Sequence, residues 1–164
     1  TEIYTLSLHD ALPISESKLF GDLSTASFEG KKLLLFKSSK YMNESGESIR
    51  RFIDYYKLSL TQICIIHDDL DLDCGIAKIK FDGGHGGHNG LRNIIHLCGS
   101  SFLRIRIGIG HPQKKDVIDY VLSKPTVEES IGIKLALSAS VEAVEDMMNL
   151  GVAKAMDILH SNPV

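Results

Sequence analysis

The 164-residue chain is 43% hydrophobic and 24% charged with a net charge of −3, an ordinary balance for one globular domain. No apolar run reaches the roughly 18 residues of a membrane-spanning helix, which excludes an integral membrane protein of the helical class. The beginning of the chain shows no basic region followed by an apolar one, so we expect no secretion signal and a cytoplasmic protein whose three cysteines stay free thiols.

Residues 1–15 differ in pattern from the rest of the chain. Their apolar positions follow neither the helical nor the strand period, and Pro13 interrupts them. The segment resembles translated sequencing-adapter sequence. We therefore predict a non-native N-terminal segment over residues 1–15 and one domain over residues 16–164.

Strands and helices are predicted in turn from residue 18 onward. Two strands, at residues 19–24 and 32–36, flank Glu29-Gly30 and are typical of a hairpin. A helix should follow, because apolar residues recur at i, i+3, i+4 and i+7. Its buried stripe consists of Ile49, Phe52, Ile53 and Tyr56.

The middle of the chain predicts three more strands and a helix. Residues 62–67 form a near-continuous apolar run, typical of a strand that is buried on both faces. Further strands are predicted at residues 75–81 and 102–109. The helix between them should bury the stripe Leu91, Ile94, Ile95 and Cys98.

The last third of the chain is predicted to be helical. A short helix is expected at residues 114–122, and Thr126 with Glu129 forms a capping-box signature that opens a longer helix. Gly151 should end that helix, and a final helix is expected at residues 152–160. The alternation predicts the α/β class, as a single three-layer α/β/α domain with a twisted mixed sheet.

Carboxylates follow the apolar run at residues 62–67. Ligands of open α/β sheets gather at the C-terminal ends of the strands, so this position is typical of a functional site. Asp68, the first residue beyond the predicted strand, could orient a catalytic histidine and stabilise its charge. We interpret Asp71 and Asp73 as parts of a solvated acidic turn.

Residues 83–90 contain five glycines, two histidines and one asparagine, a composition that leaves the backbone exposed to a ligand. The Asn89 amide offers donors and an acceptor for a carbonyl group or a water molecule. Capping of the following helix is an alternative role for Asn89. The loop lacks the Walker A and dinucleotide-binding patterns. A metal site that uses His85 and His88 is a weaker alternative, because their spacing in a glycine loop fixes no geometry.

Basic residues are concentrated around this loop. Residues 76–115 contain seven basic side chains and one acidic side chain, although the whole chain is acidic. On predicted strands Lys78 and Lys80 share one face, as do Arg104 and Arg106. The concentration indicates a site for a polyanion, with a solvated charged face as the alternative.

Four motifs follow one another along the chain with characteristic spacing. They are Tyr41-Met42-Asn43, His67-Asp68-Asp69-Leu70-Asp71, residues 83–91, and Arg104-Ile105-Arg106-Ile107-Gly108-Ile109-Gly110-His111-Pro112. In this order the motifs are similar to those of bacterial peptidyl-tRNA hydrolases. The resemblance covers about residues 16–160.

The resemblance implies a monomeric enzyme without metal or cofactor and without an obligate protein partner. Its activity would be hydrolysis of the ester bond between peptide and tRNA, which recycles tRNA in translation. Its partner would be peptidyl-tRNA, bound at the acceptor stem and the 3′ end.

The resemblance also implies roles for individual residues. In the family a histidine activates water and an aspartate partners it, and Asp68 matches that aspartate. Asn43 and Asn89 match asparagines that hold the peptidyl part and the water or oxyanion. Met42 and His88 match residues that line the same crevice. Lys80 and Arg106 match a basic pair that binds phosphate at the tRNA end.

One part of the family pattern does not match. The family opens with a strand and a glycine-rich loop, followed by the catalytic histidine, and residues 1–15 lack these features. We therefore expect the printed chain to be impaired in turnover. A non-catalytic module that binds the tRNA 3′ end or acceptor stem is the alternative, and a metal-dependent hydrolase using His85, His88 and Asp68 is a third hypothesis.

Overall fold

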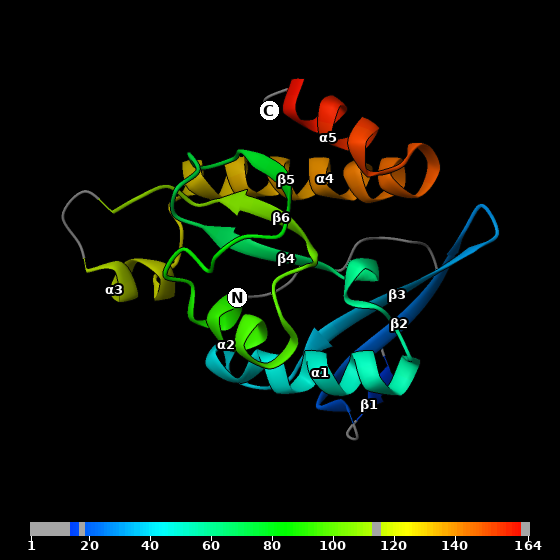
Figure 1. Ribbon diagram of the computed structural model, residues 1–164. Helices are drawn as coiled ribbons and strands as arrows, with labels where there is room; N and C mark the ends of the chain where they lie inside the picture. Colours follow the sequence, from blue (N-terminus) through cyan, green and yellow to red (C-terminus); the bar gives the residue numbers. More distant parts are fainter. Residues whose placement is uncertain (1–13, 17–18, 113–115, 162–164) are drawn as a thin grey trace. The chain divides into compact units, whose positions relative to one another are not determined.

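The computed structural model describes residues 14–16, 19–112 and 116–161 (Figure 1). The chain divides into two compact units. The first takes the chain up to Ile63 together with Phe81–Leu103, and the second takes Cys64–Lys80 together with the chain from Arg104 onward. Most of residues 1–15, which were predicted to be non-native, lie outside the described residues.

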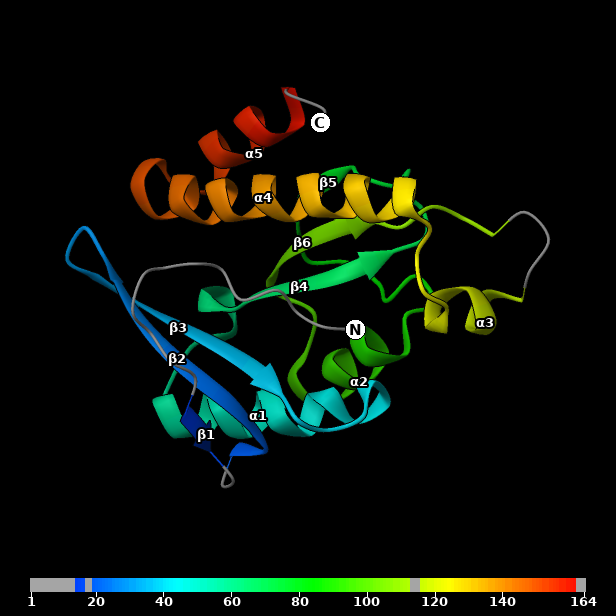
Figure 2. The same ribbon diagram turned by 180° about the vertical axis from the view of Figure 1, so that it is seen from behind.

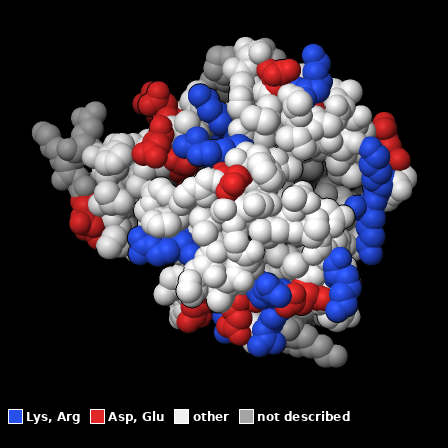
Figure 3. Space-filling model, in the orientation of Figure 1, with Lys and Arg blue, Asp and Glu red and all other residues white. Residues whose placement is uncertain are grey.

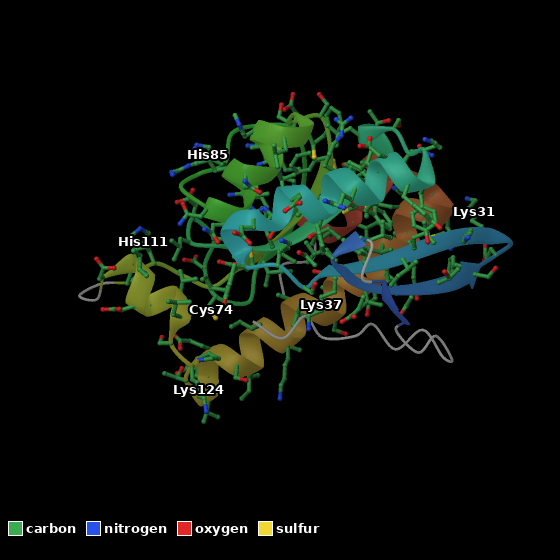
Figure 4. All side chains as sticks on the ribbon, turned by 90° about the horizontal axis from the view of Figure 1, so that it is seen from below. Lys31, Lys37, Cys74, His85, His111 and Lys124 are labelled. Atoms are coloured by element: carbon green, nitrogen blue, oxygen red, sulfur yellow. The ribbon has the colours of Figure 1, made fainter. Side chains whose placement is uncertain are left out.

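An antiparallel sheet of order β1-β2-β3 forms one part of the first unit. Its strands are β1 (Ile14–Glu16), β2 (Gly21–Phe28) and β3 (Lys31–Ser38). Glu29 and Gly30 join β2 to β3 with φ values of 47° and 77°, the left-handed backbone that a tight two-residue hairpin turn requires. The predicted hairpin is therefore confirmed, with longer strands. Lys31 lies near its turn and Lys37 near the other end of β3 (Figure 4).

Two helices and two short 3₁₀ turns complete the described part of the first unit. The elements are the turn η2 (Met42–Glu44), α1 (Ser45–Tyr56), the turn η3 (Leu60–Gln62) and α2 (Asn89–Cys98). Both helices were predicted from their apolar stripes. Phe52 of α1 is 5% exposed, and its ring stacks on Phe36 of β3 with a centroid distance of 4.7 Å.

Helices α1 and α2 approach closely at Gly46. The Gly46 N–H, one of the donors that the first helical turn leaves without an internal partner, donates to Asn93 Oδ1 at 2.7 Å. A Cβ atom on Gly46 would lie 2.6 Å from the Asn93 carbonyl oxygen. Only glycine fits this contact without movement of the backbone of α2.

Replacing Gly46 with alanine should therefore destabilise the protein by about 1–3 kcal/mol, because the added methyl group meets backbone and not a flexible side chain. Denaturant unfolding measures the change. Gly84→Ala is the matched control, since a Cβ at Gly84 meets nothing within 4 Å, and we expect a change within about 0.5 kcal/mol. Equal stability of the two variants would contradict the close contact.

The second unit contains a mixed sheet of order β4-β6-β5. Its strands are β4 (Cys64–Asp69), β5 (Ala77–Phe81) and β6 (Leu103–Gly108), with the last residue of β5 and the first of β6 counted in the first unit. Strand β6 runs parallel to β4 and antiparallel to β5. Bonds that fix these directions run from Leu103 N–H to Ile63 O, from Ile109 N–H to Asp69 O and from Asp82 N–H to Phe102 O. The predicted α/β class and mixed sheet are confirmed.

The bounds of β4 differ from the prediction at both ends. Residues 60–62 form the turn η3, whose last side chain accepts from the Ser59 N–H at 2.8 Å, so the strand begins only at Cys64. It then continues through Asp69, because the backbone there still pairs with the chain after β6. The prediction that Asp68 is the first residue beyond the strand is therefore wrong. The six residues of β4 are half-buried, not fully buried as expected.

The remaining elements of the second unit are helical. They are α3 (Val117–Leu122), α4 (Val127–Leu150) and α5 (Val152–Ser161). The predicted capping box opens α4: Thr126 Oγ1 accepts from the Glu129 N–H at 3.2 Å, and Glu129 Oε2 accepts from the Thr126 N–H at 2.7 Å. Residues 114 and 115 of the predicted short helix lie outside the described residues.

Helix α4 lies along the sheet of the second unit, and α5 folds back against α4 (Figures 1 and 2). The sheet is close enough for the Ile79 N–H of β5 to donate to His160 Nε2 of α5 at 3.0 Å. Although α4 has 24 residues, no helix in the described part of the chain combines the length and apolarity that a bilayer crossing requires.

Candidate active site

The glycine-rich loop of the first unit is held in a tight turn before α2. Gly83, Gly86 and Gly87 have positive φ values of 109°, 53° and 82°, and the His88 N–H donates to the His85 carbonyl oxygen at 2.9 Å. Glycine adopts this backbone without the steric cost that a Cβ brings. Gly86 and Gly87 are exposed, which leaves backbone accessible before the start of α2.

His88 caps α2. Its Nδ1 accepts a hydrogen bond from the Leu91 N–H at 3.1 Å. The alternative role of Asn89 as helix cap is therefore wrong, and Asn89 is the first residue of the helix. Asparagine and histidine side chains can both accept this bond, so the choice between them depends on the backbone path of the loop.

The bonds of the two loop histidines fix which ring nitrogen carries the proton. Nδ1 accepts in His88, and in His85 it accepts from the Gly87 N–H at 3.1 Å. A neutral imidazole whose Nδ1 accepts carries its proton on Nε2, which then donates. As arranged here, each neutral ring presents its Nε2–H as a hydrogen-bond donor.

Two exposed amides lie in the first unit, at Asn43 in η2 and at Asn89 in α2. Neither side chain has a hydrogen-bond partner among the residues that the structure describes. Ser45 fixes the turn that carries Asn43, because its Oγ donates to the Met42 carbonyl oxygen at 2.8 Å. Both amides are thus presented on ordered backbone and are accessible to a ligand.

Gly90 makes room for the side chains around these amides. A Cβ atom at Gly90 would lie 2.6 Å from Met42 Sδ and 3.0 Å from His88 Cε1. The structure therefore brings Met42 and His88 together over the first turn of α2, beside Asn89. Sequence reasoning did not single out Gly90, although its position directly after Asn89 was a signal.

Asp68 lies in the second unit, within β4, and is half-buried. His67 Nδ1 lies 2.7 Å from the Asp68 carbonyl oxygen, so the backbone holds that ring.

Cys64, at the start of the same strand, is not a nucleophile at neutral pH, since burial raises the pKa of its thiol to about 12.

Asp69, which sequence reasoning left without a role, forms an ion pair with Arg106. Arg106 Nε donates to Asp69 Oδ2 at 2.7 Å, and the side chains are 22% and 14% exposed. Burial acts to raise the pKa of Asp69. The hydrogen bonds from Arg106 and from the Asp71 N–H, together with the Arg106 charge, outweigh burial and lower it below the ordinary value. Asp69 is therefore ionised at neutral pH.

The predicted basic residues of the second unit differ in exposure. Lys78 and Lys80 are exposed on one face of β5, as their spacing predicted. Arg104 and Arg106 lie two residues apart in β6, as expected, but Arg104 is only 2% exposed whereas the Arg106 side chain is 22% exposed, so only Arg106 of this pair is accessible to a polyanion. On the face drawn in Figure 3, basic and acidic side chains are interspersed.

No group of three or more histidine, cysteine, aspartate or glutamate side chains within the described ranges is placed to hold a metal ion. Of the predicted site residues, Met42, Asn43, His88 and Asn89 lie in the first unit. Asp68, Lys80 and Arg106 lie in the second.

Comparison with known proteins gives one consistent family. The family model described as "Peptidyl-tRNA hydrolase" matches residues 4–164. A peptidyl-tRNA hydrolase of Ruthia magnifica subsp. Calyptogena magnifica is 46% identical over 148 residues, which are 89% of this chain and 78% of the relative. The Shewanella frigidimarina enzyme is 42% identical over 151 residues, which are 90% and 77% of the two chains.

The solved structures agree with the sequence relatives. The crystal structure of a peptidyl-tRNA hydrolase from Acinetobacter baumannii superposes with a TM-score of 0.88 at 34% sequence identity. The similarity covers 93% of this chain and 79% of that one.

Proposed function

The chain belongs to the peptidyl-tRNA hydrolase family, and from this premise we propose which of its residues perform the hydrolysis. The reaction is cleavage of the ester between peptide and tRNA, which returns tRNA to translation. The observation that carries the assignment is the pair of exposed amides, Asn43 and Asn89, on ordered backbone beside Met42 and His88. Their donors and acceptors suit a peptide and its ester carbonyl.

Asn89 is proposed to hold the attacking water or to stabilise the oxyanion that forms as the ester carbonyl is attacked. The first turn of α2 fixes the backbone that carries this amide, so only the side-chain torsions are left to be set when the substrate binds. Asn43 is proposed to bind the peptide, with Met42 and His88 lining the same crevice. The Nε2–H of His88 adds a donor there, in keeping with its capping bond.

Asp68 is proposed to orient a histidine base and to stabilise the imidazolium that forms when the base takes a proton from water. The rings of His85 and His88 are arranged as donors, which argues against either as the base. We assign the base to the histidine of the family's N-terminal segment, a pattern that residues 1–15 of this sequence do not match.

Lys80 and Arg106 are proposed to bind phosphate at the end of the tRNA, with the acceptor stem and 3′ end as the recognised region. The exposed Lys80 supplies a mobile point charge, and Arg106 supplies a planar set of donors. We further propose that the chain acts as a monomer in the cytoplasm, where its substrate is made, and needs no metal or cofactor.

The tRNA role of the basic pair predicts a specific salt dependence. Replacing Lys80 or Arg106 with alanine should weaken tRNA binding and reduce the slope of log K against log salt by about 0.7 for each lost phosphate contact. The dissociation constant is measured at several salt concentrations. Lys154→Ala, at an exposed position on α5, is the control and should leave the slope unchanged. Weaker binding with an unchanged slope would argue against a phosphate contact.

A further inference from the structure

The ion pair of Asp69 and Arg106 uses only one of the three nitrogens of the guanidinium group. The guanidinium has five N–H donors, and Asp69 Oδ2 takes the one on Nε at 2.7 Å. This contact uses the inner nitrogen. The two outer nitrogens, which form the fork suited to a phosphate, are not used by the bond to Asp69.

Asp69 is itself held in place. Its Oδ1 accepts from the Asp71 N–H at 2.9 Å, and its carbonyl oxygen accepts from the Ile109 N–H at 3.1 Å. Both carboxylate oxygens are therefore bonded, and the backbone belongs to the sheet. One carboxylate oxygen is held by the Asp71 N–H and the backbone of Asp69 is paired with Ile109, so Asp69 provides a rigid support for the longer and more flexible arginine side chain.

We propose that Asp69 is a positioning residue for substrate binding, which holds the Arg106 guanidinium so that its outer N–H groups face a phosphate of the tRNA. This proposal rests on the proposed role of Arg106. It adds a residue for which neither the motifs nor the basic pair alone gave a role.

Asp69 has two opposing effects on phosphate binding. Its negative charge reduces the attraction of Arg106 for an anion, whereas its bond to Nε fixes the direction of the guanidinium. Salt and solvent screen this charge effect only in part, because the two side chains are 22% and 14% exposed. The geometric effect is not screened, because two parallel bonds to one phosphate require the fork to be aligned. We therefore expect the orienting effect to dominate.

The test measures binding of deacylated tRNA to the 164-residue chain as a function of salt. Asp69→Ala should raise the dissociation constant about tenfold and flatten the salt slope by up to about 0.7, as the Arg106 contact is lost. Asp69→Asn keeps one oxygen that can accept from Nε, although its NH2 group then faces the Asp71 N–H, and it should bind tRNA more tightly than Asp69→Ala. Asp54→Asn is the control, since Asp54 accepts from Arg50 Nε at 2.9 Å in an exposed pair on α1.

The variants are repeated in an Arg106→Ala background. If Asp69 acts through Arg106, Asp69→Ala has no further effect there. Should Asp69→Ala fail to fold, Asp69→Ser takes its place, because a hydroxyl can satisfy the Asp71 N–H without reaching Arg106.

Binding by Asp69→Ala that equals or exceeds that of the parent would overturn the proposal, as would equal losses in Asp69→Ala and Asp69→Asn. These results, with Arg106→Ala still weakened, leave the tRNA role of Arg106 intact. Unchanged binding by Arg106→Ala would instead overturn the proposed role of Arg106, and with it the role of Asp69.

Discussion

Replacing Asp68 with asparagine should lower the turnover of peptidyl-tRNA by about 10²–10⁴-fold and leave KM within about threefold of the parent value. The histidine base becomes positively charged in the transition state, and Asp68 is proposed to supply the matching negative charge. Asparagine keeps the shape but removes that charge. The half-buried position in β4 makes the loss larger than at a solvated site.

The measurement is kcat and KM in a chimera that joins the N-terminal segment of one relative named above to this chain from residue 16. Asp73→Asn is the matched control, because Asp73 is an exposed carboxylate of the acidic turn. An equal fall in kcat for both variants, or a large rise in KM for Asp68→Asn alone, would contradict the assignment.

Replacing Asn89 with alanine should lower the hydrolysis rate on the order of 10²–10³-fold, the usual cost of removing one oxyanion donor. The helix should tolerate the change. His88 and not Asn89 caps α2, and alanine is a better helix former than asparagine. The expected result is therefore a slow enzyme of nearly normal stability.

Asn149→Ala is the control for this variant, since Asn149 is an exposed asparagine near the end of α4. Thermal melting of each variant accompanies the rates. A loss of activity in Asn89→Ala that only follows a loss of folded protein would show that Asn89 has a structural role and not a chemical one.

Local rules predicted the elements that local interactions determine. The hairpin follows from two positive-φ residues at Glu29 and Gly30, and the start of α4 follows from the reciprocal bonds of Thr126 and Glu129. Each signal lies within a few residues of the structure that it forms. The α/β class followed from the alternation of such elements.

Long-range pairing explains what the sequence could not predict. The backbone of β4 still pairs at Asp69 with Ile109, so the exact end of the strand depends on a partner far along the chain. For the same reason the sequence alone did not predict the ion pair of Asp69 with Arg106 or the burial of Arg104. A strand pattern shows which residues share a face, but it does not show how far the core covers that face.

The site was predictable to the extent that its residues are close in sequence. Asn89 follows His88 directly, and the glycine-rich pattern of residues 83–90 indicated both. The contact of Met42 with the start of α2, and the bond from Gly46 to Asn93 that ties the two helices, join residues more than forty positions apart. Such contacts appear only once the helices are packed.

The most direct test of the central claim follows release of peptide and free tRNA from labelled peptidyl-tRNA in the presence of EDTA. The chimera and the 164-residue chain are compared, and tRNA binding is measured in the same samples. We predict that both bind tRNA and that the chimera cleaves the ester despite the chelator. Binding by the chimera without release would contradict ester hydrolysis, and release that EDTA abolishes would contradict a mechanism carried by the Asp68–histidine pair and Asn89.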